Sequence, residues 1–264
     1  MHSVLARLYV DGAFLESFCA GPDQALARYD LTPRETAALT GIDRDAIRKY
    51  ASSLRMKTEG RFENMYRLLL TLAADAFHKY YLRFFELRTI RPYETFDGPI
   101  VELGQFLESS FAGNPEVPPY AAELARYQRL FYQARFEPRT RTASLTEPAA
   151  VDALDGRLRL AVAPGVRVER FQYDMAAIEA ALRKDEIPQD VEPKACQVVF
   201  QSLPAMGRAR KFQVSASTAE LLSRCDGTRE IGGIAEILGA DREAVLEAAA
   251  KLLRLGLLEE VVAA

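Results

Sequence analysis

The stretch from Phe212 to Ile231 constrains the fold more than any other part of the chain. Phe212 and Val214 alternate with polar neighbours, which is the period of a β-strand with one buried face. Ser217 can cap the helix that follows, and Asp226-Gly227 can end it, because glycine readily takes the positive φ of a helix C-terminus. The stretch therefore predicts a strand, a helix and a tight turn in immediate succession.

Two more helices are predicted after this turn, the first beginning at Thr228 and the second following from Asp241 and covering 242–255. The first is expected to bury Ile231, Ile234, Ile237 and Leu238. The second carries a core stripe of Val245, Ala248, Ala249, Leu252 and Leu255. A parallel stripe consists of Leu246, Ala250 and Leu253. This last helix is therefore either buried on two sides or forms one wall of a groove, and Gly256-Leu257-Leu258 closes the pattern.

A small antiparallel sheet is predicted before Phe212. Strand-like runs at 158–162 and 166–173 are joined by Pro164-Gly165, a third run lies at 196–203, and Gly207 marks the turn into the strand at Phe212. A helical segment at 175–186 interrupts the series and is interpreted as an insertion. The predicted fold class is α+β: an N-terminal all-helical domain, then a small domain at 157–264 with a three-stranded antiparallel sheet and three helices.

The order of strand, helix, "CDGTREI", two helices and "GLL" resembles the PqqD-like peptide-recognition domains over residues 157–261, and winged-helix domains share part of this pattern. These domains bind the leader segment of ribosomally made peptides. The resemblance implies that the peptide adds as a strand between the last strand, here 210–214, and the third helix, here 242–255. The peptide-binding residues expected on this basis are Arg208, Arg210, Lys211, Phe212, Gln213, Val214, Arg242, Leu246, Ala250 and Leu253. The three cations at 208–211 would suit an acidic leader, or form only a solvated charged turn.

The N-terminal domain is predicted to span 1–137. Residues 3–58 contain short helices, with a capping box at Thr32-Pro33-Arg34-Glu35 and a helix cap at Asp43. The phrase at 8–54 resembles the small helical module related to the LigA subunit of extradiol dioxygenases, which has no catalytic centre of its own. Its role is interpreted either as helical packing alone or as part of a peptide-modification protein.

Residues 59–88 give the strongest helix signal, with aromatic side chains at three- and four-residue steps. This helix is expected to be a central core helix, or to offer one edge to a partner protein. The segment "PPYAAELARYQRLFYQA" at 118–134 resembles part of the helical partner proteins of multinuclear non-haem iron oxidases, although Gln128 stands where that family has Glu. The predicted partner interface consists of Tyr80, Tyr81, Phe85, Tyr120 and Tyr127. Residues 138–156 are predicted to be a linker.

The composition argues for a binding subunit rather than a catalyst. Only two histidines occur, His2 and His78. The sequence therefore offers few residues for an imidazole-based metal site or for a histidine-dependent catalytic triad. No P-loop, GxGxxG or CxxC motif is present, and the net charge is −3, which does not favour nucleic acid or an anionic membrane. Three dispersed cysteines, together with the absence of an apparent signal peptide and of a long apolar run, predict a cytoplasmic protein.

Taken together, the three resemblances are those of the TglI-like partner proteins of TglH-like iron-dependent oxidases. They imply a non-catalytic subunit of a heterodimer in ribosomal peptide (RiPP) biosynthesis. It would bind the precursor or carrier peptide through a RiPP recognition element and present the C-terminal cysteine to the oxidase, which excises the cysteine β-carbon on a 3-thiaglutamate-type pathway. Iron is expected in the partner subunit, and no catalytic residue, metal or cofactor is expected in this chain. The alternatives are a winged-helix DNA-binding regulator, which the acidic residues Glu243 and Glu247 disfavour, and an autonomous enzyme.

Overall fold

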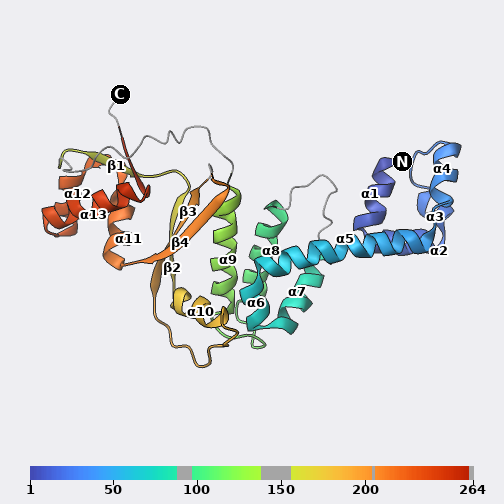
Figure 1. The fold of residues 1–264 in the computed structure, drawn as a ribbon, viewed down its shortest axis with the longest axis horizontal. Coiled ribbons are helices and arrows are strands. Elements are labelled where there is room, and N and C mark those ends of the chain that lie inside the picture. The colour runs from blue at the N-terminus through green and yellow to red at the C-terminus, as the bar shows by residue number, and fades with distance from the viewer. Residues whose placement is uncertain (88–96, 138–155, 204–205, 262–264) are drawn as a thin grey trace. The chain divides into compact units, whose positions relative to one another are not determined.

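The computed structural model describes residues 1–87, 97–137, 156–203 and 206–261. The chain divides into two compact units, Met1–Pro119 and Tyr120–Ala264, and each is described by itself. The first is helical throughout its described residues, and the second combines helices with two three-stranded antiparallel sheets (Figure 1). The coarse prediction of an α+β chain with a helical N-terminal part is therefore confirmed.

The first unit contains eight helices in its described part. Their bounds are α1 His2–Val10, α2 Gly12–Ala20, α3 Pro22–Leu26, α4 Pro33–Thr40, α5 Arg44–Met65, α6 Arg67–Leu72, α7 Ala74–Leu87 and α8 Asp97–Phe111. The predicted capping box is confirmed: the Thr32 N–H donates to Glu35 Oε2 at 3.0 Å, and the Glu35 N–H donates to Thr32 Oγ1 at 3.3 Å. Asp43 caps α5 through the N–H groups of Asp45 and Ala46, also as predicted.

The prediction of a single helix at 59–88 is wrong. The chain instead breaks at Tyr66, with φ −104° and ψ 28°, and at Ala73, with φ −155° and ψ 70°. Neither break contains glycine or proline, so the local sequence has no helix-breaking residue that would predict the two breaks. Phe62, Tyr66, Leu69 and Phe77 all have no exposed surface. By the helical period these four side chains would share one face of a single straight helix, so their spacing predicts no break.

The second unit is built around the sheet β2-β3-β4. It contains β2 Val166–Phe171, β3 Cys196–Leu203 and β4 Arg208–Val214, all antiparallel, and Val199 of β3 is paired with Val168 on one side and Phe212 on the other. These strands lie where the alternation of apolar and polar residues predicted them. Gly207 turns the chain into β4 with φ +59°, a conformation that glycine adopts without a steric penalty.

A second sheet, which the sequence did not predict, joins β5 Asp226–Glu230, β1 Arg159–Val162 and β6 Leu258–Glu260 in that order. Gly227 does have a positive φ, +82°, but it lies in β5 and does not cap a helix. Thr228 also lies in β5, where its N–H and hydroxyl both donate to Asp226 Oδ1. The prediction that a helix begins at Thr228 is therefore wrong, and α12 Ile231–Leu238 begins three residues later.

Three helices follow β4: α11 Ala216–Arg224, α12 and α13 Arg242–Arg254. The cap of α11 is Ser215, whose side chain accepts from the Thr218 N–H, and not Ser217 as predicted. Asp241 caps α13, since its side chain accepts from the Ala244 N–H. Ile237 and Leu255 were expected in the core but are 54% and 43% exposed. Ile231, Ile234, Val245, Ala249 and Leu252 are buried in the cluster that these helices share with β1 and β3.

The central sheet has helices on both faces. Val168, Val199, Phe212 and Val214 point to the face that packs on the α11–α13 cluster. Phe171 and Phe200 point to the other face, where they meet Tyr127 of α9 Ala121–Phe136 at ring-centroid distances of 5.7 Å (Figure 1). The helix α10 Met175–Leu182, at the predicted insertion, lies on the same side and buries Met175 and Ile178.

The structure places α9 in the second unit, whereas the sequence grouped it with the helical domain ending at 137. The reason is that Tyr127, Leu124 and Leu130 are buried, and α9 packs on β3 and β4. The predicted linker at 138–156 lies, except for Gly156, outside the described residues. In the part of the chain that the structure describes, none of the helices combines the length and the apolar character that crossing a membrane requires.

Candidate functional site

The strand β4 forms an edge of the central sheet. It pairs with β3 along its length, and among the described residues no strand pairs with its other side. Alternate residues of an edge strand direct their N–H and C=O groups away from the sheet, where another chain can pair with them. Ala209, Arg210, Lys211 and Phe212 are each only half-buried, consistent with an open edge.

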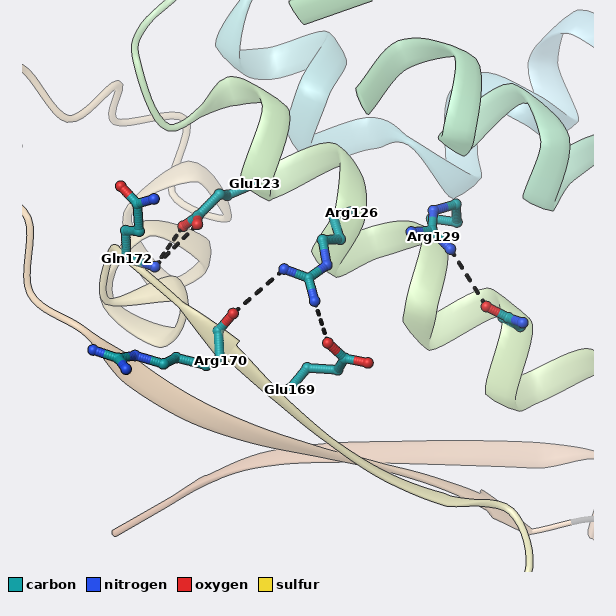
Figure 2. A network of polar contacts seen from close by, with 7 residues as sticks. Glu123, Arg126, Arg129, Glu169, Arg170 and Gln172 are labelled. Atoms are coloured by element: carbon teal, nitrogen blue, oxygen red, sulfur yellow. Dashed lines mark hydrogen bonds and ion pairs between the residues drawn. The ribbon is translucent and has the colours of Figure 1, made fainter. Parts of the chain in front are cut away.

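The opposite edge, at β2, is partly occupied by polar side chains of α9 (Figure 2). Arg126 forms an ion pair with Glu169 and donates to the carbonyl oxygen of Arg170 at 3.4 Å. Beyond the end of β2, Glu123 accepts from the Gln172 N–H at 2.8 Å. These contacts occupy backbone groups along β2 and just beyond its end, whereas the backbone of β4 pairs with β3.

One flank of the β4 edge is apolar. Phe212 and Val214 of β4, and Leu246 and Leu253 of α13, are all half-buried and pack on the same core. Since these side chains are not fully covered, they leave a partly exposed apolar surface along β4 and α13. The structure thus places these four side chains against one core, and the groove between this strand and this helix stays a prediction.

Arg210 fastens β4 to the C-terminal end of α13. Its guanidinium donates to the carbonyl oxygen of Leu255 and to Oε1 of Gln201, the latter at 2.5 Å. Gln201 in turn donates to the carbonyl oxygen of Gly256 at 2.8 Å. A cation at a helix C-terminus is favourable, because the last carbonyl groups carry partial negative charge. Arg210 therefore positions the two elements, which is a different role from the predicted contact with peptide.

The remaining predicted peptide-binding residues are dispersed. Arg208 and Gln213 are exposed, and Ala250 is 7% exposed within the core. Arg242 lies at the far end of α13, where its guanidinium is so close to Gly156 and Gly232 that a Cβ on Gly156 would clash with it. Lys211 points to the opposite face of the sheet from Phe212, so it cannot line the groove toward α13.

Lys211 is part of a partly buried polar cluster, which we call the α10 cluster: Lys211, Glu179, Tyr127 and Arg183. The Lys211 ammonium lies 3.0 Å from Glu179 Oε2, which also accepts from the Tyr127 hydroxyl at 2.6 Å. Arg183 donates to Glu179 Oε1 through Nε at 3.0 Å and through Nη2 at 2.6 Å. Lys211 Nζ also lies 3.9 Å from the centre of the Tyr127 ring, a cation–π contact.

Burial and charge oppose one another in this cluster. Burial raises the pKa of Glu179, but the charge of Lys211 and the hydrogen bonds from Tyr127, Lys211 and Arg183 lower it overall. Burial also lowers the pKa of Lys211, and the ion pair with Glu179 offsets this in part. The pKa of Tyr127 is raised by burial and by the nearby carboxylate. The ionised carboxylate is therefore the favoured form of Glu179.

Two open hollows meet at Gln213 on β4. One, of about 420 Å³, lies on the α10 side and is lined by Glu179, Arg183, Lys211 and Gln213 among others. The other, of about 440 Å³, lies where β3 begins and β4 ends, and Gln197, Gln213, Val214 and Ser215 help to line it. The edge strand β4 is thus bordered by two surface depressions.

The predicted partner-interface residues lie mostly in the cores of their own units. Tyr81, Tyr120 and Tyr127 are 4%, 1% and 4% exposed. Tyr120 donates to the carbonyl oxygen of Pro188 at 2.8 Å, and the Tyr80 hydroxyl accepts from Asn114. Phe85 is half-buried against Phe62 and Tyr81. The exposed apolar residues of α7 are instead Leu82 and Leu87, at 57% and 72%.

Sequence reasoning missed Glu179 and Arg183. A signal was present, because a carboxylate and a guanidinium four residues apart on a helix commonly pair. Their position beside Lys211 depends on how α10 packs against the sheet, which no local pattern encodes.

The described residues contain no group of three or more His, Cys, Asp or Glu side chains placed to hold a metal ion. Burial raises the pKa of Cys196, and it raises that of Cys225 to about 11, so neither thiol is readily ionised at neutral pH. His78 forms a 3.3 Å contact with Glu63 on the surface of the first unit. In comparisons with known proteins, neither a family model nor a curated protein matches this chain.

Proposed function

We propose that the second unit binds an extended peptide, which pairs with β4 as an additional strand and places side chains in the groove toward α13. The observation that carries this proposal is the open β4 edge beside a half-buried apolar flank. Backbone pairing would supply affinity that depends little on sequence, and the groove and hollows would supply specificity.

In this proposal the chain is a recognition subunit in ribosomal peptide biosynthesis. It binds a precursor or carrier peptide and presents the C-terminal cysteine to a TglH-like iron-dependent oxidase, which excises the β-carbon. The resemblance of the sequence to TglI-like partner proteins is the basis for this part. The subunit contributes by raising the effective concentration of the peptide and by orienting it, with the chemistry performed by the partner.

Substitutions in the groove test the peptide-binding part of the proposal. Phe212→Asp and Leu246→Asp place a charge on the apolar flank, and each is expected to weaken peptide binding about tenfold or more. The measurement is fluorescence anisotropy with a labelled candidate precursor peptide. Ile237→Asp is the matched control, because Ile237 is an exposed apolar residue of α12 outside the groove. Unchanged affinity in both groove variants, with the fold intact, would place the peptide elsewhere.

Co-expression tests the partner. The chain is expected to co-purify with the iron oxidase encoded nearby, and the pair is expected to bind the precursor peptide more tightly than the oxidase alone. A chain that binds neither, but retards a DNA fragment from its own promoter region, would instead support the winged-helix regulator.

A further inference from the structure

The hollow on the α10 side of β4 is not explained by the groove toward α13. It is lined on one side by Lys211 and Gln213 of β4 and on the other by Glu179 and Arg183 of the α10 segment. The proposed groove lies on the side of β4 that faces α13. On the opposite side of β4, the α10 segment forms the wall of the hollow.

A bound strand would present side chains to both flanks. Successive residues of a strand point to opposite faces of the sheet, so residues next to each other in the peptide would face α13 and α10 in turn. A residue opposite Phe212 faces the apolar flank. Its two neighbours, opposite Lys211 and Gln213, face the hollow.

The hollow carries an excess of positive charge. Lys211 and Arg183 are both cationic, and Glu179 is the only acidic residue among the described residues that line the hollow. Both oxygens of Glu179 already accept hydrogen bonds from the α10 cluster. An opposite charge directly across a pair of strands is favourable, and a like charge is not. An acidic side chain therefore complements this site.

Arg183 is the residue best placed to meet such a side chain. It follows the last residue of α10, and its side chain is 67% exposed although its guanidinium is bonded to Glu179. Lys211, at 15% exposure, lies deeper, over the rings of Tyr127 and Phe131. The carboxylate of Glu179 holds both cations, so the positive charge is fixed at one end of the hollow.

We infer that this hollow is a specificity site for an acidic side chain of the bound strand, adjacent to an apolar residue that faces α13. The inference rests on the proposed binding of a strand at β4. It predicts a ligand in which Asp or Glu lies between two apolar residues, one opposite Phe212 and the other on the same face.

Selection from a random peptide library tests this inference on the full chain. Displayed dodecapeptides that bind are expected to share the apolar–acidic–apolar pattern. For a selected peptide, replacing the acidic residue by its amide is expected to weaken binding about tenfold, equivalent to about 1.4 kcal/mol. In Arg183→Gln the same replacement is expected to change affinity by about twofold or less.

Arg224→Gln is the matched control, because Arg224 also pairs with a glutamate four residues earlier, Glu220, but lies on α11 outside the hollow. It removes the same charge and is expected to leave the tenfold effect of the amide replacement unchanged. Binders without an acidic preference, or an equal response in both variants, would overturn the inference while leaving strand addition intact. A library that yields no binder at the β4 edge would overturn both.

Discussion

Lys211 shows how one residue can belong to a binding strand without lining its predicted groove. It lies between Arg210 and Phe212, which both point toward α13, and it therefore points toward α9 and α10. There it is 15% exposed and paired with Glu179. A buried cation requires such a partner, because the desolvation of an unpaired charge is costly.

The ion pair gives a prediction for stability against pH. Glu179→Gln leaves Lys211 without a carboxylate and is expected to reduce the free energy of unfolding by about 3 kcal/mol at pH 7. The pKa of Glu179 in the folded chain lies below the ordinary 4.5, so its stabilisation is fully present above pH 4.5 and is lost as the pH falls through the lower folded value. The difference between the two proteins in denaturant unfolding should therefore shrink below pH 4.5.

Glu220→Gln provides the comparison for this measurement, since the Glu220–Arg224 pair is about half-exposed on both sides. Exposed pairs of this kind contribute little to stability. A loss of stability as large in Glu220→Gln as in Glu179→Gln, or a Glu179 effect that does not depend on pH, would contradict the assigned role of the buried pair.

At the scale of the element, β4 combines a paired side and an open side. Alternate N–H groups bond to β3, and those between them are available to a ligand. In the described structure, Arg126 and Glu123 bond to backbone groups along β2 and just beyond its end, and the paired side of β4 bonds to β3.

A proline scan of β4 tests this arrangement. Proline removes one N–H group, and at an edge strand it is tolerated where that group faces outward. Substitutions at 209–213 are expected to alternate: one set destabilises the fold, and the other leaves the fold intact but weakens peptide binding. Alanine at the same position is the control at 210–213. Proline variants that fold and bind normally at every position would show that β4 does not pair with the peptide.

The sequence predicted helices and strands well where the segment carries several apolar residues, and poorly where it carries few or none. Residues 196–203 contain the apolar run Val198-Val199-Phe200, and β3 has the predicted bounds. The strand β5, with the sequence DGTRE, has no apolar residue, so only its pairing with β1 identifies it as a strand. The breaks at Tyr66 and Ala73 similarly depend on tertiary packing.

At the scale of the whole chain, the position of α9 decides what folds as a unit. Tyr127 covers Phe171 and Phe200, which are both fully buried in the second unit. The sequence placed this helix in the first domain because its helical period says nothing about its packing partner. The same limitation hid the α10 cluster, whereas the apolar character of Phe212 and Leu246 could be predicted from the local sequence, and both pack on the core.

Two fragments test this division. The fragment 120–264 is expected to unfold cooperatively, with a near-native circular dichroism spectrum for its elements. The fragment 157–264 lacks α9 and exposes Phe171 and Phe200, so it is expected to aggregate or to lose cooperative unfolding. Equal stability of the two fragments would show that α9 is not part of the core of this unit.

The most direct test of the central claim is amide hydrogen exchange of the full chain with and without a bound peptide. Pairing of a peptide with β4 predicts slower exchange at alternate residues between 208 and 214, at the N–H groups that face away from β3. Exchange in β2 and in the first unit should change little. A bound peptide that leaves exchange in β4 unchanged, and slows it in another segment, would contradict strand addition at this edge.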